Sequence, residues 1–371
     1  MEQNWQLIAN VSSFDTPFLA VHPERIRENI GLALEMVHYD LSRFRPHIKT
    51  HKMAEVLQLF LDRGIAKVKC ATIAEAELAA ATGIADVLLA YQPVGAKVGR
   101  FLALMEKFPE THFSCLVDHL ASAEHIGAQA ILHGKNVPVY IDLNTGMNRT
   151  GYPYRADLPD FYRAIAGVPG LIPVGLHIYD GHLQNTDARE RVKPAKEALD
   201  FILKDVAIIE GQGWPRPIIV AGGSNTFSFY AAETTVECSP GTFVFWDINY
   251  AVALPELPFK FAAVLAMTVI SKPTSDTICL DLGYKSVSSE QPLEKRMICY
   301  WNNDLSAIGH SEEHLVLKCK GPVRYEVGDL IYGIPFHVCP SVALYDQVYV
   351  VKDRHITGTW QVAARGKKVT I

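Results

Sequence analysis

Three observations in the sequence predict an α/β protein, a (β/α)8 barrel joined to a β-rich domain. From residue 43 to about residue 250, short apolar runs typical of buried parallel strands alternate with segments of helical periodicity. After Tyr250 no long helical pattern follows, and β-prone runs are separated by Gly, Pro, Asn and Asp. The length of 371 residues fits a barrel of about 250 residues and a smaller domain. We therefore assign residues 15–255 to the barrel, and residues 256–371 with residues 1–14 to the β domain.

The order of the elements follows from the spacing of the apolar residues. A strand over residues 16–21 tolerates Pro17 because the proline falls at its start. Pro23 then opens a helix in which Ile26 and Ile30 keep the helical period. The eight barrel strands are predicted at residues 43–49, 67–71, 86–90, 112–117, 137–143, 174–179, 218–221 and 235–239. Strands of the β domain are predicted at residues 262–270, 277–282, 313–319, 329–334 and 347–351.

The densest group of ionisable residues lies at the end of the first barrel strand, in the octet Arg45-Pro46-His47-Ile48-Lys49-Thr50-His51-Lys52. Phe44 and Met53 add an apolar side that a solvated basic loop would lack. Pro46 favours an extended backbone before it, so the segment is predicted to be a strand end that opens into a loop. A lysine placed there among other cations is desolvated and repelled towards a lower pKa, which a Schiff-base amine requires. Lys49 is therefore the candidate nucleophile, and the helix over residues 53–62 follows it.

Two more strand ends carry candidate site residues, since barrel enzymes place their chemistry after the carboxyl ends of the strands. Asn144–Gly151 follows the fifth strand, and its two glycines permit a tight turn that presents Arg149 as a fixed cation. Tyr179–His182 ends the sixth strand. His182 is the candidate general base, because an imidazole gains and loses a proton near neutral pH.

The seventh and eighth strand ends are glycine-rich. Glycine lets backbone amides approach a phosphate closely, and the seventh strand end is a usual phosphate site in barrels. Ser224 and Thr226 add hydroxyl donors. The candidate phosphate-binding residues are Gly222, Gly223, Ser224, Asn225 and Thr226, with Gly241 and Thr242 after the eighth strand.

His337-Val338-Cys339 is the candidate metal site. On an extended segment, residues i and i+2 share a face, so that the imidazole and the thiolate can reach one ion. Cysteine with histidine favours zinc, whereas Mn²⁺ or Mg²⁺ would prefer oxygen ligands. The nearby acidic segment Glu312-Glu313-His314 has no assigned role.

Taken together, these segments resemble the motifs of the D-threonine aldolase and D-serine dehydratase family, pyridoxal 5′-phosphate (PLP) enzymes of fold type III with an alanine-racemase-like barrel. The resemblance implies that Lys49 carries PLP, that Arg149 meets its phenolic oxygen and that Tyr179 contacts it. It also implies that Gly222–Thr226, Gly241 and Thr242 hold the phosphate, that His182 is a base, and that His337 and Cys339 bind a divalent metal. Related enzymes of this fold are homodimers, so we expect a homodimer here.

The resemblance implies a lyase that acts on D-3-hydroxy amino acids, with two reactions left open. In a retro-aldol cleavage, His182 takes the hydroxyl proton, and glycine and an aldehyde form. In a dehydration, Lys49 takes the α-proton, and a 2-oxo acid and ammonia form. Cys339 is more typical of the dehydratases and Tyr179–His182 of the aldolases, and we favour the aldolase. A racemase and a non-catalytic PLP-binding protein are further alternatives.

Composition and charge exclude other classes. The net charge of −5 offers no global attraction for nucleic acid or an anionic membrane. No apolar run approaches a membrane span, and the first residues do not resemble a signal peptide. The seven cysteines are scattered and favour a reducing cytoplasm.

Overall fold

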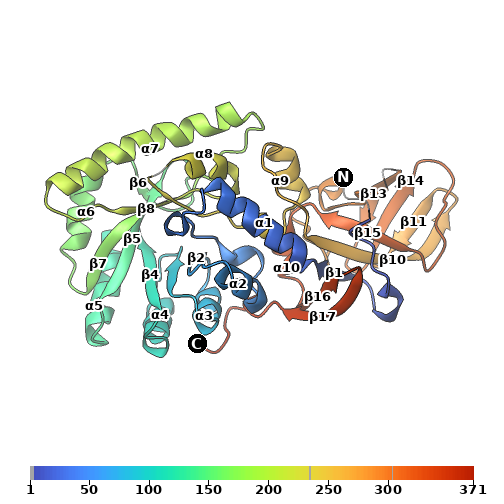
Figure 1. Ribbon diagram of the computed structural model, residues 1–371, viewed down its shortest axis with the longest axis horizontal. Helices are drawn as coiled ribbons and strands as arrows, with labels where there is room; N and C mark the ends of the chain where they lie inside the picture. Colours follow the sequence, from blue (N-terminus) through green and yellow to red (C-terminus); the bar gives the residue numbers. More distant parts are fainter. Residues whose placement is uncertain (1–3, 234, 303) are drawn as a thin grey trace. The chain divides into compact units, whose positions relative to one another are not determined.

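The structure is a computed structural model that describes residues 4–233, 235–302 and 304–371. The chain divides into two compact units (Figure 1). The barrel unit comprises Ala33–Lys49, Ala54–Gly241 and Gly366–Ile371. The β unit comprises the described residues up to Leu32, Thr50–Met53 and Thr242–Arg365. The predicted combination of a parallel α/β domain with a separate β-rich domain is confirmed, and the boundary at residue 255 stays a prediction.

The barrel unit is built on parallel strands in the order β2-β3-β4-β5-β7-β8-β9, with the short β6 beside β5. Most of their residues are buried, because the strands are apolar and covered on both faces. The strands are β2 (Lys67–Cys70), β3 (Asp86–Leu89), β4 (His112–Val117), β5 (Val137–Asn144), β6 (Tyr152–Pro153), β7 (Leu171–Ile178), β8 (Ile218–Ala221) and β9 (Glu237–Cys238).

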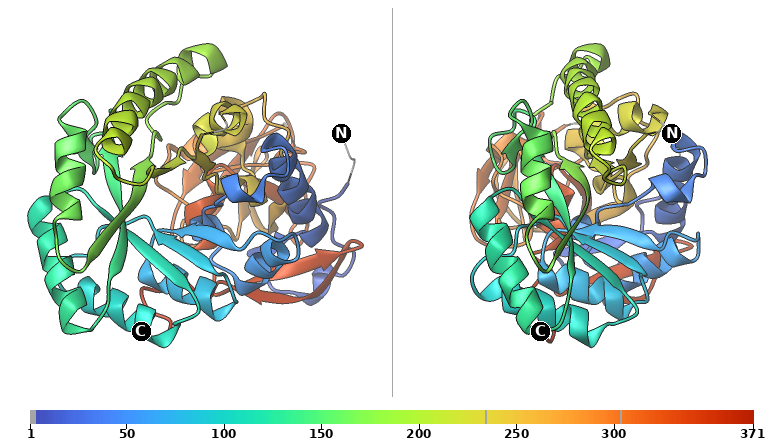
Figure 2. Two further views of the ribbon diagram at one scale, coloured as in Figure 1. Left: turned by 60° about the vertical axis from the view of Figure 1, so that its left-hand side comes forward. Right: turned by 90° about the vertical axis from the view of Figure 1, so that its left-hand side faces the viewer.

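Helices follow the strands and cover the outer face of the sheet; α3, α4 and α5 lie side by side along it (Figure 2). Two side chains fix the start of α3: Thr72 Oγ1, at the N-cap, accepts the N–H of Glu75 at 3.1 Å, and the Glu75 carboxylate accepts the N–H of Ala71 at 2.6 Å. The helices are α2 (Ala54–Leu61), α3 (Ile73–Ala81), α4 (Ala96–Lys107), α5 (Leu120–Leu132), α6 (Leu158–Ala166), α7 (Ala188–Gly211) and α8 (Phe227–Ala232).

The segment predicted as the first barrel strand, residues 43–49, is not a regular strand. Two 3-10 turns, Leu41–Arg43 and Ile48–Thr50, flank residues 44–47, which form single parallel bridges to β9 and β2. Pro46 is the physical reason, because it has no N–H for a continuous ladder. Instead, the N–H of Arg45 donates to Cys238 O at 2.9 Å, and Pro46 O accepts the N–H of Lys69 at 2.9 Å. Residues 44–47 thus lie between β2 and β9, the two edge strands of the sheet, in the position of an eighth barrel strand.

A buried ion network reinforces this junction. Arg45 is 1% exposed, and its guanidinium donates to both carboxylate oxygens of Asp86 on β3, at 2.7 and 2.8 Å. Its Nε donates to Glu237 on β9 at 2.6 Å. Lys67 on β2 donates to the other oxygen of Glu237 at 2.6 Å. The network therefore links the bridging segment to three strands.

The β unit contains a largely antiparallel sheet in the order β13-β14-β11-β10-β1-β16-β17, in which β15 pairs with β10 and β12. Its core includes Phe18, Val264, Ile334 and Val351. The strands are β1 (Phe18–Val21), β10 (Ala263–Thr274), β11 (Thr277–Leu280), β12 (Met297–Ile298), β13 (Leu305–His310), β14 (Leu315–Cys319), β15 (Leu330–Pro335), β16 (Gln347–Lys352) and β17 (His355–Gln361). Its short helices are α9 (Ile248–Ala253) and α10 (Val338–Val342), while α1 (Pro23–Met36) belongs partly to each unit.

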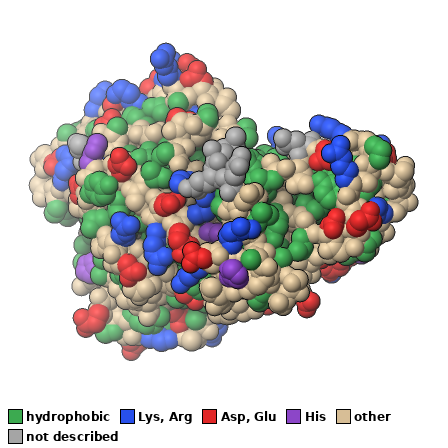
Figure 3. All heavy atoms as spheres, turned by 45° about the vertical axis from the view of Figure 1, so that its right-hand side comes forward, with side chains coloured by type: hydrophobic (Ala, Val, Ile, Leu, Met, Phe, Trp, Pro, Cys, Tyr) green, Lys and Arg blue, Asp and Glu red, His purple; other side chains and the backbone are tan. Residues whose placement is uncertain are grey.

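Acidic and basic side chains are interspersed over the face shown in Figure 3, with no large patch of one sign. Within the described residues, no helix combines the length and the apolar composition that crossing a membrane requires.

Loss of the Arg45 guanidinium should destabilise the barrel unit strongly. In Arg45→Met, Glu237 keeps its buried position but loses its buried partner, so we expect the free energy of unfolding to fall by about 3–5 kcal/mol. Urea unfolding followed by circular dichroism measures the change. Arg216→Met is the matched control, since its ion pair with Glu210 is partly exposed and should contribute less than about 1 kcal/mol. Equal losses in the two variants would contradict the role of the network.

Candidate active site

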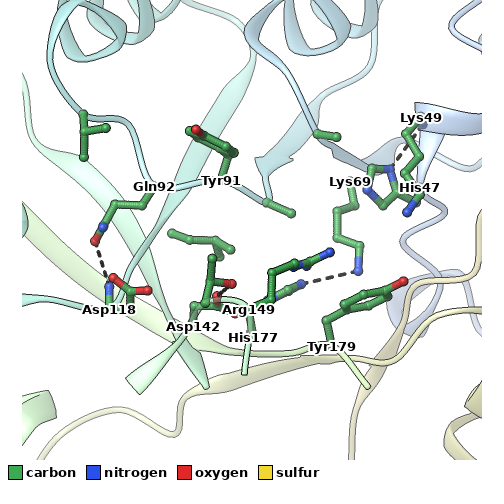
Figure 4. A pocket seen from close by; sticks show the side chains of 15 residues that line it. His47, Lys49, Lys69, Tyr91, Gln92, Asp118, Asp142, Arg149, His177 and Tyr179 are labelled. Carbon is green, nitrogen blue, oxygen red and sulfur yellow. Dashed lines mark hydrogen bonds and ion pairs between the residues drawn. The ribbon is translucent and has the colours of Figure 1, made fainter. Parts of the chain in front are cut away.

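A cavity of about 500 Å³ opens where β2, β3, β4, β5 and β7 end (Figure 4). This volume suits a small-molecule cofactor with a substrate. Cationic, acidic and aromatic side chains converge on it from separate strands, as expected at the carboxyl end of a parallel sheet. The polar and aromatic lining consists of His47, Lys49, Lys69, Tyr91, Gln92, Asp118, Asp142, Arg149, Thr150, His177 and Tyr179.

Three basic side chains surround the ring of Tyr179. Arg149 Cζ lies 4.7 Å from the ring centroid, and the Nζ atoms of Lys49 and Lys69 lie at 5.6 and 5.9 Å. The aromatic face attracts whichever of these groups is charged and offsets part of their mutual repulsion. The resulting concentration of positive charge suits an anionic ligand.

Two glycines make room for the Tyr179 ring. A Cβ on Gly181 would lie 2.5 Å from the Tyr179 hydroxyl oxygen, and a Cβ on Gly223 would lie 3.0 Å from the ring. Any side chain at Gly181 would therefore push the ring out of its position. The Tyr179–His182 segment and the Gly222–Thr226 segment are thus packed against each other through Tyr179.

A buried chain of polar groups crosses the floor of the cavity. Asp142 on β5 contacts His177 Nδ1 on β7 at 2.7 Å and accepts the Thr150 hydroxyl at 2.7 Å. His177 Nε2 lies 3.4 Å from Lys69 Nζ on β2. All three of Asp142, His177 and Lys69 are less than a tenth exposed. The chain therefore joins three strands under the cavity.

Burial dominates the electrostatics of Lys69. Loss of water, followed by repulsion from Lys49, lowers the pKa of Lys69 to about 7, although Asp180 and Asp142 act in the opposite direction. Burial and the nearby Lys69 also lower the pKa of His177, which favours its neutral form. Lys69, Asp142 and His177 were not selected from the sequence. One signal could have indicated Lys69: a strand predicted to be buried contains two lysines, Lys67 and Lys69.

Only glycine fits at the first position of the Gly222–Thr226 segment without strain. Gly222 has a φ of 75°, and a Cβ there would lie 2.7 Å from the Tyr230 ring. Two of its polar side chains are engaged within the protein: Thr226 donates to Asp180 at 2.8 Å and Asn225 donates to Leu183 O at 2.9 Å. These side chains shape the segment. The N–H of Gly222 donates to Ile178 O at 2.9 Å, so the backbone amides after Gly222 are the main candidates for phosphate contacts. Ser224 is buried in the 3-10 turn Ser224–Thr226.

The loop that carries Arg149 is held by Asn144, whose Oδ1 accepts the N–H groups of Gly146 and Asn148 at 3.0 and 3.1 Å. His182 lies against this loop, because a Cβ on Gly146 would be 3.0 Å from His182 Nε2. The His182 side chain is exposed, and neighbouring protein atoms lower its pKa by desolvation. A neutral, accessible imidazole of this kind suits a proton acceptor.

His337 and Cys339 lie in the β unit in a geometry that differs from the predicted one. His337 is the N-cap of α10, and the helix begins at Val338. The segment is therefore not the continuous extended stretch that was predicted. The two side chains still interact: burial lowers the pKa of His337, but hydrogen bonding to Cys339 and to Glu290 raises it to about 9 overall. Glu290 contacts His337 Nδ1 at 2.5 Å. Among the described residues, no group of three or more His, Cys, Asp or Glu side chains could hold a metal.

Backbone and hydroxyl groups position this pair. Asp247 is fully buried and accepts the N–H of Val338 at 3.0 Å. The hydroxyl oxygens of Thr50 and Thr242 lie 3.2 and 3.5 Å from Cys339 Sγ. Cys339 is half-buried, whereas the other six cysteines, all within the described residues, are buried.

The structure brings some predicted site residues together and separates others into different units. Lys49, Arg149, Tyr179 and the Gly222–Thr226 segment belong to the barrel unit. Gly241 ends a part of that unit and Thr242 begins a part of the β unit, which also holds His337 and Cys339. Glu312 and Glu313 form exposed ion pairs with Lys285 at 2.6 and 3.2 Å. The roles predicted for the site residues stay predictions.

Residues 21–248 match the family model described as alanine racemase, N-terminal domain. The chain belongs to the alanine racemase N-terminal domain family. Residues 262–351 match a second model, the putative serine dehydratase domain. The resemblance drawn from the motifs is thereby confirmed, and membership of this family supports PLP as the cofactor.

Relatives of known name match over nearly the full length. The chain is 25% identical to D-threonine aldolase from Arthrobacter sp over 357 residues, which cover 95% of this chain and 93% of the relative. It is 26% identical to 3-hydroxy-D-aspartate aldolase from Paracoccus denitrificans (strain Pd 1222) over 367 residues, 96% of this chain and 93% of the relative. The crystal structure of D-threonine aldolase from Filomicrobium marinum has a TM-score of 0.88 at 24% identity, covering 97% of this chain and 98% of that one. The fold is therefore shared over both units.

Proposed function

We propose that this protein is a PLP-dependent lyase of D-3-hydroxy amino acids, which cleaves them between the α- and β-carbons to glycine and an aldehyde. The observation that carries the proposal is the cationic cavity at the strand ends, in which Lys49 and Arg149 face the ring of Tyr179. Full-length similarity to aldolases of D-threonine and 3-hydroxy-D-aspartate supports the substrate class.

The residues of the cavity fit PLP. Its volume of about 500 Å³ is large enough, and the three basic side chains around Tyr179 match an anionic ring substituent. The narrow backbone turn at Gly222 leaves no room for a side chain, as a phosphate cradle requires. In this proposal Lys49 attaches PLP, Arg149 faces its phenolic oxygen, and the amides of Gly223 and the residues after it hold its phosphate. The N–H of Gly222 donates to Ile178 O at 2.9 Å, so Gly222 contributes through its lack of a side chain. PLP, when bound, supplies an electron sink for cleavage at the α-carbon.

Side chains of the protein then transfer protons and position the ligand. His182 accepts the proton of the substrate's β-hydroxyl at its imidazole, which its accessible position permits. Arg149 and Tyr179 hold the bound ligand against the strand ends and exclude water from that side. Lys49 holds a proton at Nζ once its amine is released.

We also propose that His337 and Cys339 hold a divalent metal. An imidazole and a thiol that already interact are two donors of the type that zinc prefers, and Glu290 orients the imidazole through Nδ1. The ion would supply a Lewis acid. Mn²⁺ or Mg²⁺ would fit this sulfur-containing pair less well.

Dehydration to a 2-oxo acid and ammonia is the second candidate reaction. One observation favours it: the part of the chain that holds Cys339 matches the putative serine dehydratase domain. In this reaction Lys49, rather than His182, takes the decisive proton, at the α-carbon. Cleavage therefore requires His182 as the base, whereas dehydration does not.

Cofactor attachment should map to Lys49. Borohydride reduction of the PLP-loaded protein, proteolysis and mass spectrometry should locate the pyridoxyl group on the peptide with Lys49. Lys49→Ala should abolish the label, whereas Lys69→Met should retain it. A label on Lys69, which lies at a similar distance from Tyr179, would refute the assignment.

Product analysis decides between the two reactions. With D-threonine we expect glycine and acetaldehyde, and His182→Ala should lower kcat/KM by about 10²–10⁴-fold because it removes the general base. His125→Ala, which alters an exposed histidine of α5, is the control and should leave the rate unchanged. A 2-oxo acid as the sole product, with little effect of His182→Ala, would establish the dehydratase instead.

Metal removal should separate PLP binding from turnover. Chelation should abolish activity while the cofactor absorbance stays near its starting value, since PLP is held by barrel residues. Cys339→Ser should lose bound zinc in elemental analysis, whereas Cys319→Ala, at a buried cysteine of β14, should retain it. Full activity of the metal-free protein would rule out the catalytic metal.

A further inference from the structure

We propose that Lys69 is a second proton-exchanging amine of the cavity, which takes a proton from the α-carbon of the bound amino acid and returns it. The proposal rests on the proposed function, because it assumes that the cavity holds an amino acid. It adds a group that no motif indicated, and it assigns His177 and Asp142 as the residues that position this amine.

The first argument is the geometry at Lys69 Nζ. The nitrogen lies 3.4 Å from His177 Nε2 and 3.4 Å from Gly222 O, so two of its hydrogens have acceptors. An amine nitrogen is tetrahedral, and one further position remains besides the bond to the side chain. Lys69 lines the cavity, where Figure 4 shows its side chain extending towards His177. The remaining position holds a lone pair in the amine and a proton in the ammonium, which is what proton exchange requires.

The second argument concerns the tautomer of His177. The Asp142 carboxylate only accepts hydrogen bonds, so His177 Nδ1, 2.7 Å away, carries the hydrogen. Burial favours the neutral imidazole, which leaves a lone pair on Nε2 facing Lys69. The Thr150 hydroxyl donates to the second oxygen of Asp142 and helps to fix this carboxylate. Lys69 therefore donates to His177, in either of its own protonation states.

The third argument is the balance of charge around Lys69. Lys49 and Arg149 repel its positive form, whereas Asp142 and Asp180 attract it, and burial removes water from all sides. The net pKa of about 7 keeps amine and ammonium both populated near neutral pH. The titratable and charged groups that face Lys69 are Lys49, Asp142, Arg149, His177, Tyr179 and Asp180.

The proposed step is a plain proton transfer. The C–H bond at the α-carbon breaks, an N–H bond forms at Lys69, and the electron pair stays with the amino acid. The reverse step restores the C–H bond and the neutral amine. No oxidant, reductant or further reactant is needed.

NMR of the full-length protein, labelled with ¹³C and ¹⁵N in lysine, tests the amine directly. We expect one lysine side-chain resonance to titrate with a midpoint near pH 7, and to be absent from Lys69→Met. Lys196→Met, which alters an exposed lysine of α7, is the control and should retain it. A protein in which every lysine titrates above pH 9 would overturn the proposal without touching the proposed function.

A second variant tests the positioning residues. Asp142→Asn removes a charge that favours the ammonium form and allows the amide to donate to His177, so that Nε2 turns into a donor facing Lys69. We expect the Lys69 midpoint to fall by at least one pH unit, whereas Asp118→Asn, at the cavity wall just after β4, should shift it less. An unchanged midpoint in Asp142→Asn would show that the Asp142–His177 pair does not hold this amine.

Stability measurements provide a readout that needs no activity. The folded-state pKa of Lys69, about 7, lies below its ordinary value of 10.5, so the unfolded chain binds more protons between these pH values. Stability should therefore rise with pH across this window, and Lys69→Met should flatten the rise. An identical pH profile for Lys69→Met and the parent protein would contradict the lowered pKa.

Hydrogen exchange links the amine to the substrate. In D₂O, the PLP-loaded protein should exchange the α-hydrogens of glycine, and Lys69→Met should slow this exchange at least tenfold while PLP stays bound. Undiminished exchange in Lys69→Met would assign Lys69 to holding the Gly222 carbonyl and would overturn the proposal. If D-threonine is not cleaved although glycine exchange depends on Lys69, the proposed lyase reaction fails and the role of Lys69 stands.

Discussion

The barrel unit depends on how Arg45 is held at the junction between the first and last strands of its sheet. Pro46 prevents a continuous ladder there, so single bridges and a buried guanidinium replace the missing strand. A buried arginine is costly unless its charge is matched, and Asp86 and Glu237 supply two carboxylates at hydrogen-bonding distance. In the folded protein, the contacts that close the sheet therefore also neutralise this charge.

The same segment carries Lys49, only four residues after Arg45. The ion network fixes one end of the segment, and the 3-10 turn Ile48–Thr50 directs Lys49 into the cavity from the other. Rigid strands then supply the opposite wall, through Asp142 on β5 and His177 on β7. Reactive groups are thus placed by backbone elements that packing already fixes, which keeps the entropy lost on ligand binding small.

Most of the fold and part of the candidate site could be predicted from the sequence. Apolar runs specify buried strands, and the expectation that site residues follow the carboxyl ends of the strands selects Lys49, Arg149 and Tyr179 together. The misses have local causes. Pro46 turned an expected strand into two bridges, and helix α10 begins where an extended segment was expected. Lys69 was missed because a lysine inside a buried strand contradicts the usual pattern. Its partners lie 73 and 108 residues away in the chain, beyond the reach of any local motif.

The distribution of thiols has a consequence for how the protein responds to oxidants. Six cysteines are buried, and burial raises the pKa of Cys115, Cys238 and Cys299, so little reactive thiolate forms at these positions. Cys339 is half-buried and lies beside the imidazole of His337. Peroxide or an alkylating reagent would therefore act first at the proposed metal ligand. Oxidation would therefore remove the thiol ligand of the proposed metal site before it reached the buried cysteines of the core.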